Sequence, residues 1–521
     1  MVDPFSIIST LDICFKYGSM LVELCSAFKN ATSKIIELVL RLKNYWIRAQ
    51  VQLKIVKSIA HTLDDEHRKI QQETLDLLAS KLKIAVQSIE SVTKSKDSDD
   101  ESVTVRVKRW KYALFQQKIE SAIQDLELWQ QMFDPSWYLI IKAATPQIDT
   151  ELKIYKQTIP ADGQAPIVSA RSLRSALAPT STHQPPIFLP ETGLDSIQLD
   201  SIPLCTAKFG RRDEDISKAL VVERIHRFPE TDIRQLEKDV RDLARKLAHS
   251  SPLEFGLLNC KGVIKHFEQD AYPTGPSAFT FVFRMPPRLS QPRSLRSLLQ
   301  NTKPPDSLSD RFRLANELAR AISYVHTFGF VHKNIRPETV LLLRSEDASI
   351  GSMFLIGFDS FRSAEGKTLR KGDLAWERCL YQHPGRIGPT AREDYIMQHD
   401  IYSLGVCLLE LGLWESFVLY SEKDLGLSDG QVLTTRTTPA PSLRSDRSSS
   451  LYQDRLLSLA RGELRTIMGT RYSEVVVTCL TCLDPGNVDF GDESEFQDED
   501  GIQVGVRYIE KVIMRLNSIF V

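Results

Sequence analysis

Several common classes of protein are excluded by what this sequence lacks. Its 66 Lys and Arg are balanced by 67 Asp and Glu, so no basic excess points to a nucleic-acid partner. No run of 18 apolar residues is free of charged side chains, and the first residues lack the basic segment of a secretory signal. We therefore expect no conventional membrane span and a cytoplasmic location.

The cysteines also lack the spacing of a metal-binding motif. The eight Cys are scattered, and the single C-x-x-C, formed by Cys479 and Cys482, lies in an apolar helical pattern with no second pair or His cluster beside it. This arrangement favours buried, reduced thiols over a zinc site, and it suits a reducing compartment.

Residues 1–150 carry the clearest periodicity in the chain. A mostly apolar first helix is expected over residues 5–29, and heptad spacing recurs over residues 75–92 and 112–133. The longest heptad series comprises Ile35, Val39, Leu42, Trp46, Ala49, Leu53, Val56, Ala60 and Leu63. These patterns predict an antiparallel bundle of four helices. We expect the fourth to end at Asp134-Pro135, because Pro lacks the backbone donor.

A change of composition separates this region from the rest of the chain. Six Pro fall between residues 159 and 192, so we assign residues 151–199 to an extended linker and residues 200–521 to a second folded body. Within that body, residues 425–454 are rich in Ser, Thr, Arg and Pro and are expected to form a disordered insertion. Residues 484–500 are expected to form a solvated acidic loop, whose spacing does not match a calcium-binding loop.

The second body resembles a protein kinase. Its strands and helices alternate in the kinase order, and residues 330–343 resemble the catalytic loop H-R-D-x-x-x-x-N with the apolar strand that follows it. His332 keeps its place, but the position of the catalytic base carries Asn334 and a metal-binding position carries Thr339. An amide cannot accept the substrate proton, and a lone Thr hydroxyl is a poor ligand for a divalent ion. The resemblance therefore implies a kinase fold without its acid–base group.

The nucleotide-binding positions depart from the family as well. The Gly-rich loop keeps one glycine, Gly210, and the strand position of the phosphate-binding Lys carries Glu223, or Arg224 if the register slips by one. The metal-binding Asp of D-F-G is replaced by Gly357, although Asp359 lies two residues away. We therefore expect no catalytic residue, no metal and no cofactor. Binding of ATP and magnesium is expected only under the alternative in which Asp359 replaces the missing metal ligand.

Structural kinase positions are retained in part. His332 is expected to support the loop backbone, and Asp400 resembles the kinase Asp that caps this loop from the next helix. The usual Ala-Pro-Glu becomes His383-Pro384-Gly385, while Gly486 and Asn487 stand where its Arg partner is expected. Losing both partners together avoids one unpaired buried charge.

The N-terminal region resembles a second family. Its opening Asp-Pro-Phe-Ser-Ile and residues 125–137 resemble the HeLo or HeLo-like domains of fungal cell-death proteins, and residues 200–521 resemble the kinase-like domains found behind them in filamentous fungi. Because members of that family disrupt membranes through N-terminal helices, the resemblance implies membrane action by the first helix. The alternative is that this helix is simply the central helix of the bundle.

The expected architecture is multidomain α and α+β, an antiparallel helical bundle followed by a bilobal protein-kinase-like fold. We favour a signalling or cell-death effector, in which an inactive kinase-like domain binds protein partners and regulates a bundle that self-associates and is recruited to the plasma membrane. The first alternative is a residually active Ser/Thr-type kinase that binds ATP. The second is a protein-binding scaffold without membrane activity.

Overall fold

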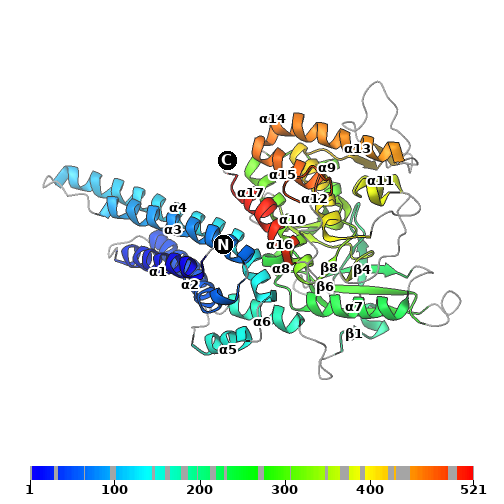
Figure 1. Ribbon diagram of the computed structural model, residues 1–521, viewed down its shortest axis with the longest axis horizontal. Helices are drawn as coiled ribbons and strands as arrows, with labels where there is room; N and C mark the ends of the chain where they lie inside the picture. The colour runs from blue at the N-terminus through cyan, green and yellow to red at the C-terminus, as the bar shows by residue number, and fades with distance from the viewer. Residues whose placement is uncertain are drawn as a thin grey trace. The chain divides into compact units, whose positions relative to one another are not determined.

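The computed structural model divides the chain into two compact units, Met1–Ser175 and Ala176–Val521, which are described separately. Figure 1 shows the elements of both units. The described residues are 3–27, 33–63, 65–93, 101–143, 147–158, 165–177, 186–195, 197–211, 219–227, 232–267, 275–305, 307–345, 350–363, 375–387, 394–420, 427–429, 446–490 and 502–519.

The N-terminal unit is helical, as its periodicity predicts. Four long helices, α1 (Pro4–Ser26), α2 (Ser33–Ile59), α3 (Asp65–Thr93) and α4 (Glu101–Ala143), are followed by α5 (Gln147–Thr158) and α6 (Ala165–Leu177). α1 packs against α2 and α3, and α4 packs against α2 and α3. Trp46 on α2, Leu78 on α3 and Trp129 on α4 are buried, which places the predicted apolar series in one core.

The first helix contributes its own heptad series to this core. Its buried residues follow steps of four and three along α1, as Ile7, Leu11, Cys14, Gly18, Leu21 and Cys25. A Cβ atom at Gly18 would lie 2.1 Å from the Trp46 ring, so the indole occupies the space that a side chain on α1 would fill. Close packing of the two helices therefore requires glycine at this position.

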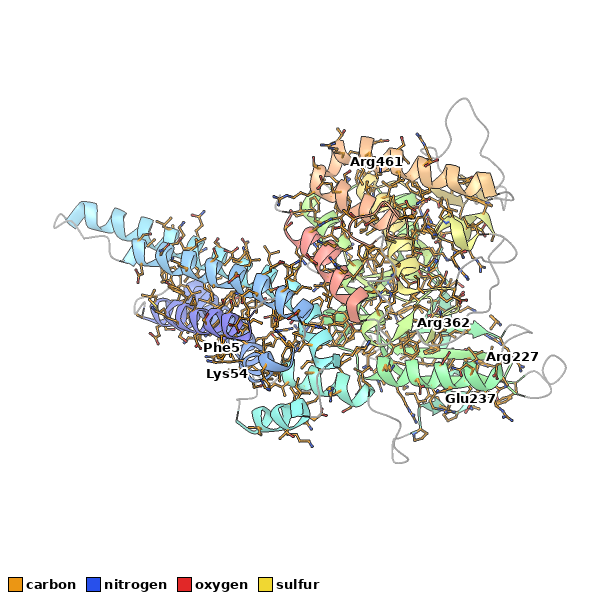
Figure 2. All side chains as sticks on the ribbon, in the orientation of Figure 1. Phe5, Lys54, Arg227, Glu237, Arg362 and Arg461 are labelled. Atoms are coloured by element: carbon orange, nitrogen blue, oxygen red, sulfur yellow. The ribbon has the colours of Figure 1, made fainter. Side chains whose placement is uncertain are left out.

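The other side of α1 is open. Phe5, which Figure 2 labels, projects from the start of this helix. Its side chain is 76% exposed, and that of Ile13 is 45% exposed. Within the described residues, Phe5–Ser26 is the one helix long and apolar enough to cross a bilayer by length and composition, and 33% of its most apolar 18-residue window is buried. Asp12 pairs with Lys57 of α2 at 2.5 Å, which ties the helix to the bundle at the surface.

The expected end of the fourth helix is wrong. α4 continues through Pro135 to Ala143. Every residue from Trp137 to Ile141 is buried, so packing on both sides of the proline outweighs the one missing backbone hydrogen bond. The Asp134 carboxylate before it accepts from Arg48 at 2.8 Å and from Gln52 at 3.0 Å.

The expected extended linker is also wrong for its described residues. α6 lies within it and buries Ile167, Ala170 and Leu173. Arg174 on α6 bonds both carboxylate oxygens of Asp149, which lowers the pKa of Asp149. Residues 186–201 belong to the second unit. Residues 159–164 and 178–185 lie outside the described part of the chain.

The C-terminal unit begins with a six-stranded sheet. Its strands are β1 (Phe188–Leu189), β2 (Gln198–Ser201), β3 (Lys208–Arg211), β4 (Leu220–His226), β5 (Asn259–His266) and β6 (Ala278–Arg284), in the order β1-β5-β6-β4-β3-β2. Among these described strands, β1 alone pairs in parallel, and the other pairs are antiparallel. β1 and β2 lie at opposite edges of the sheet, and the short turn η3 (Glu191–Leu194) lies between them in the chain. Helix α7 (Ile233–Ala248) packs against β5.

A larger, mainly helical lobe follows the sheet, and this bilobal arrangement confirms the predicted fold class. The short helix α8 (Pro252–Phe255) lies between α7 and β5 in the chain. The elements after the sheet are β7 (Leu289–Ser294), α9 (Leu295–Asn301), α10 (Leu308–Thr327), β8 (Phe330–Val331), η5 (Pro337–Thr339), β9 (Val340–Ser345), β10 (Ser352–Leu355), β11 (Arg362–Ser363), α11 (Trp376–Cys379), η6 (Pro384–Arg386), α12 (Met397–Leu413), β12 (Val418–Tyr420), β13 (Leu427–Asp429), α13 (Asp446–Leu459), η7 (Ala460–Leu464), α14 (Arg465–Met468), α15 (Thr470–Leu480), α16 (Ile502–Tyr508), η9 (Ile509–Ile513) and α17 (Met514–Asn517). The fully buried α12 is central to its core.

Two expectations for this lobe need correction. The expected insertion at residues 425–454 contains β13, which pairs with β12, and the start of α13. In the expected acidic loop, Asp489 is 8% exposed and pairs with Arg515 at 2.8 and 2.9 Å, so it is not a solvated charge. Residues 430–445 and 491–500 lie outside the described chain.

Candidate functional site

The kinase-like cleft is bounded by the inner face of the sheet. Glu223 on β4 pairs directly with Phe281 on β6, and Val221 pairs with Phe283, so these four side chains share one face. Phe281 stacks on Phe283 and meets Phe361 of the large lobe edge-on at 6.4 Å. Aromatic rings therefore pack beside the position where a kinase keeps its phosphate-binding Lys.

Glu223 is bonded to the segment that replaces D-F-G. Its Oε2 accepts a hydrogen bond from the Gly357 backbone amide at 3.0 Å. Burial, together with the smaller effect of the Asp359 charge, raises the pKa of Glu223 to about 8, although the amides of Gly357 and Phe358 oppose that rise. The other oxygen, Oε1, is buried and has no hydrogen-bond partner among the described residues. A protonated carboxyl at neutral pH fits these surroundings.

The helix next to the sheet does not supply a cation to Glu223. In a kinase, a Glu on this helix pairs with the strand Lys. Here Glu237 of α7 (Figure 2) bonds Lys265 of β5 at 2.7 Å and Arg241 of its own helix at 3.1 Å. The ion pair between this helix and the sheet is thus formed by Glu237 and Lys265 of β5. Glu223 of β4 instead accepts a hydrogen bond from the backbone of the large lobe.

Replacing Glu223 with Gln is expected to change how stability depends on pH. The pKa of Glu223 rises from 4.5 to about 8 on folding, so the unfolded chain loses this proton first and stability falls as pH rises from about 4.5 to 8. The variant should match wild type near pH 5 and exceed it by roughly 1–3 kcal/mol above pH 8. Urea denaturation at both pH values measures the difference.

Glu237→Gln is the matched control, because its side chain is partly exposed and its loss should not remove the same pH dependence. Parallel pH profiles for wild type and Glu223→Gln would contradict a raised pKa at Glu223.

Asn334, at the catalytic-base position, is fully engaged in hydrogen bonds. Its Nδ2 donates to Asp359 Oδ1 at 2.6 Å and to the Gly357 carbonyl at 3.2 Å. Its Oδ1 accepts from Arg336 Nε at 2.8 Å. Burial raises the pKa of Asp359, against the effect of the Arg336 charge. The amide therefore ties the loop to residues 357–359 and has no capacity for proton abstraction.

Thr339 and Gly357 are fitted to each other. The Thr339 hydroxyl lies 2.7 Å from the Asn334 carbonyl and 2.9 Å from the Arg336 carbonyl, and it accepts from the Arg336 amide at 3.2 Å. Gly357 has φ +90°, and a Cβ atom there would lie 2.2 Å from Thr339 Cγ2. The space that a metal-binding Asp side chain needs is thus filled by Thr339.

Asp400 lies beneath the loop and holds its backbone. Its carboxylate accepts from the amides of His332 at 2.8 Å and Lys333 at 3.0 Å, and from the Tyr395 hydroxyl at 2.7 Å. Although burial opposes it, the hydrogen bond with His326 keeps the pKa of Asp400 below its ordinary value. Burial lowers the pKa of His332 to about 4, so its neutral ring donates from Nε2 to the Ile356 carbonyl at 3.0 Å.

Gly210 serves packing in the described structure. It pairs with Leu220, which places it on the outer face of the sheet, and a Cβ atom there would lie 2.6 Å from Leu199 and 2.7 Å from Ile197. The neighbouring Arg212 and Asp213 of the expected phosphate loop lie outside the described residues.

A buried ionic cluster near the loop was not predicted from the sequence. Arg296 of α9 is fully buried and bonds Glu338 at 3.1 Å and Glu410 at 2.6 Å. It also donates to the Tyr381 hydroxyl and, at 2.8 Å, to Ser416. Because Arg296, Glu338 and Glu410 are far apart in the chain, they form no pattern that sequence analysis could detect. The fold shows that the charge of Glu338 is balanced by Arg296.

The described residues of this cleft do not fit magnesium and ATP. A carboxyl group occupies the phosphate-binding position and bonds the Gly357 amide, and the metal-ligand position has no room for a side chain. Asp359, the remaining acid, is bonded to Asn334. These contacts link the two lobes, and the described residues of the cleft include no group of metal-ligating side chains.

Comparisons with known proteins support the presence of a kinase-like fold in the chain. No family model matches the chain. A stretch of 105 residues is 30% identical to eukaryotic translation initiation factor 2-alpha kinase 1 of Mus musculus, covering 19% of this chain and 16% of that protein. Another of 144 residues is 27% identical to a probable inactive serine/threonine-protein kinase of Dictyostelium discoideum, covering 26% and 11%.

A third similarity, 29% identity over 124 residues, is to U-box domain-containing protein 52 of Arabidopsis thaliana, covering 22% of this chain and 14% of that protein. The chain thus spans between 11% and 16% of the length of these curated relatives. None of the three bears on the HeLo resemblance of the N-terminal unit, which stays a prediction.

Proposed function

We propose that the C-terminal unit is a pseudokinase that signals through protein contacts, without phosphoryl transfer. The observation that supports this most strongly is the hydrogen bond from the Gly357 amide to Glu223, because it places an acid where phosphate would bind and closes it onto the metal-ligand segment. The similarity to a probable inactive kinase fits this function. Neither ATP nor magnesium is part of the proposed mechanism.

The helical unit is the effector in this proposal. It self-associates when a protein partner engages the pseudokinase, and it then acts at the plasma membrane through α1. The apolar composition of Phe5–Ser26 and the exposure of Phe5 and Ile13 support this role. A cell-death outcome follows only from the HeLo resemblance. A scaffold without membrane activity is the competing function for the same architecture.

Nucleotide binding separates the pseudokinase from a residually active kinase. The full chain is expected to show no change in melting temperature on addition of ATP, with or without magnesium, at concentrations that saturate an active kinase. Magnesium-dependent stabilisation by ATP, together with phosphate incorporation that Asp359→Ala abolishes, would instead establish the active kinase.

Vesicle leakage tests the effector role. Anionic vesicles loaded with a fluorescent dye should leak when the full chain is clustered through a fused dimeriser. Phe5→Ser with Ile13→Ser should abolish leakage while the bundle remains folded, because both side chains are exposed. Ile36→Ser on α2, whose side chain is 60% exposed, is the control. Intact vesicles with clustered wild type would favour the scaffold.

A further inference from the structure

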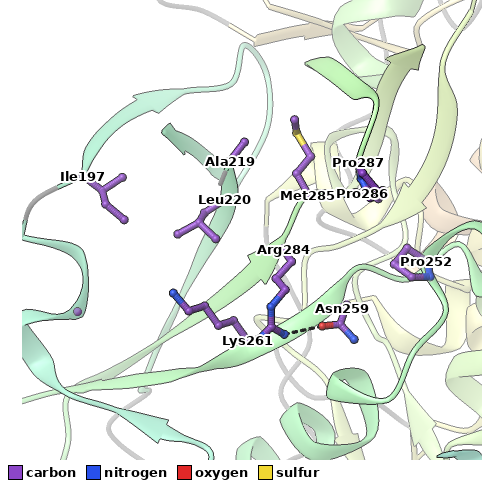
Figure 3. A pocket seen from close by; sticks show the side chains of 11 residues that line it. Ile197, Ala219, Leu220, Pro252, Asn259, Lys261, Arg284, Met285, Pro286 and Pro287 are labelled. Atoms are coloured by element: carbon purple, nitrogen blue, oxygen red, sulfur yellow. Dashed lines mark hydrogen bonds between the residues drawn. The ribbon is translucent and has the colours of Figure 1, made fainter. Parts of the chain in front are cut away.

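A cavity of about 590 Å³ lies on the side of the sheet opposite Glu223 (Figure 3). Leu220 pairs with Arg284, and Asn259 also pairs with Arg284, so these residues share the outer face. The segment from η3 to β2 covers part of that face and contributes Gly193 and Ile197 to the cavity wall. The cavity is therefore separate from the kinase-like cleft.

The wall combines an apolar surface with two cations. Leu220, Met285 and the adjacent prolines form the apolar part, and none of the described residues that line the cavity is acidic. Arg284 is oriented by Asn259, whose Oδ1 accepts from Nη1 at 2.7 Å (Figure 3). Lys261 is the extra residue of a β-bulge between Cys260 and Gly262, is exposed, and forms no ion pair among the described residues.

We propose that this cavity binds a small amphiphilic anion, a molecule with an apolar body and a carboxylate or phosphate head. The volume is in the range of small-molecule sites, which combine apolar walls with a few placed polar groups. The apolar body would lie against Leu220 and Ile197, and the head between Lys261 and Arg284. Lys261 and Arg284, with no carboxylate beside them among the described lining residues, supply the charge complementarity.

Ligand binding at this site would stabilise the segment that leads into the sheet. Gly193 and Ile197 form one wall, whereas Met285 and the prolines that follow it form the other. A ligand between them connects residues 191–197 to the segment that joins the two lobes. Occupancy therefore lowers the frequency of local opening in the segment that carries Gly193 and Ile197.

Isothermal titration of the full chain with decanoate, decyl phosphate and decanol tests the proposal. Decanoate or decyl phosphate should bind, and decanol, which has the same apolar body without a charge, should bind at least about tenfold more weakly. Whichever anion binds more tightly identifies the head group. Equal binding of decanol and both anions, or no binding of either anion, would overturn the proposal.

Variants locate the binding at this cavity. Lys261→Gln should weaken binding about three- to tenfold, whereas Lys303→Gln, an exposed Lys that does not line the cavity, should leave it unchanged. Decanoate should also slow amide hydrogen exchange in residues 191–199 of wild type, a readout that does not depend on any variant. Equal affinities of the two variants, or protection confined to other residues, would place the ligand elsewhere.

Discussion

Replacing Arg296 with Met is expected to lower the free energy of unfolding of the C-terminal unit by about 3–5 kcal/mol. Arg296 is fully buried and is the cation shared by Glu338 and Glu410. Against the effect of burial, its charge holds the pKa of Glu338 below the ordinary value, whereas burial raises the pKa of Glu410. Without the guanidinium, two carboxyl groups remain buried beside each other. Urea denaturation measures the loss.

Arg313→Met provides the matched control. Arg313 also pairs with two acids, Asp310 and Glu317, but its side chain is 37% exposed, so its loss should cost at most about 1 kcal/mol. A triple variant with Arg296→Met, Glu338→Gln and Glu410→Gln should recover part of the stability, because no charge is then left unpaired. Equal effects of the two single variants would show that the buried cluster is not structurally important.

Replacing Gly357 with Asp, which restores the kinase metal ligand in sequence, is expected to destabilise the protein by about 3 kcal/mol or more and to yield no kinase activity. The new Cβ atom would lie 2.2 Å from Thr339 Cγ2, in a backbone conformation of φ +90° that side chains rarely adopt. Thermal denaturation and phosphate incorporation check the two parts of the prediction.

Gly462→Ala is the control for this substitution, since a Cβ atom there meets nothing within 4 Å and the residue lies in a helical segment. It should leave stability unchanged or raise it slightly. A stable Gly357→Asp variant would show that Thr339 moves aside, and magnesium binding by that variant would mean that the metal site was lost through this one residue.

The fold was largely predictable because its signals are local. Heptad spacing around Trp46 and Leu78 identified the bundle, and the order of strands and helices with residues 330–343 identified the kinase-like unit. The errors arose where packing outweighs local preference. Pro135 lies inside a helix because its neighbours are buried, and the proline-rich segment contains α6 because Ile167 and Leu173 reach the core.

The candidate site was predictable as a set of substitutions and not as a set of contacts. The sequence places Glu223, Asn334 and Gly357 at kinase positions, but it gives no reason for Glu223 to bond the Gly357 amide. The fit of Thr339 against Gly357 depends on a backbone angle that the sequence does not encode locally. Arg296 was missed because its partners are 42 and 114 residues away in the chain.

The indole of Trp46 constrains how α1 leaves the bundle, because it occupies the gap that Gly18 creates in the helix surface. A helix held by a ring inserted into its surface cannot rotate about its axis or slide lengthwise without collision. Either motion would require the Trp46 ring to leave this gap first, so α1 is fixed in both rotation and register at the level of Gly18.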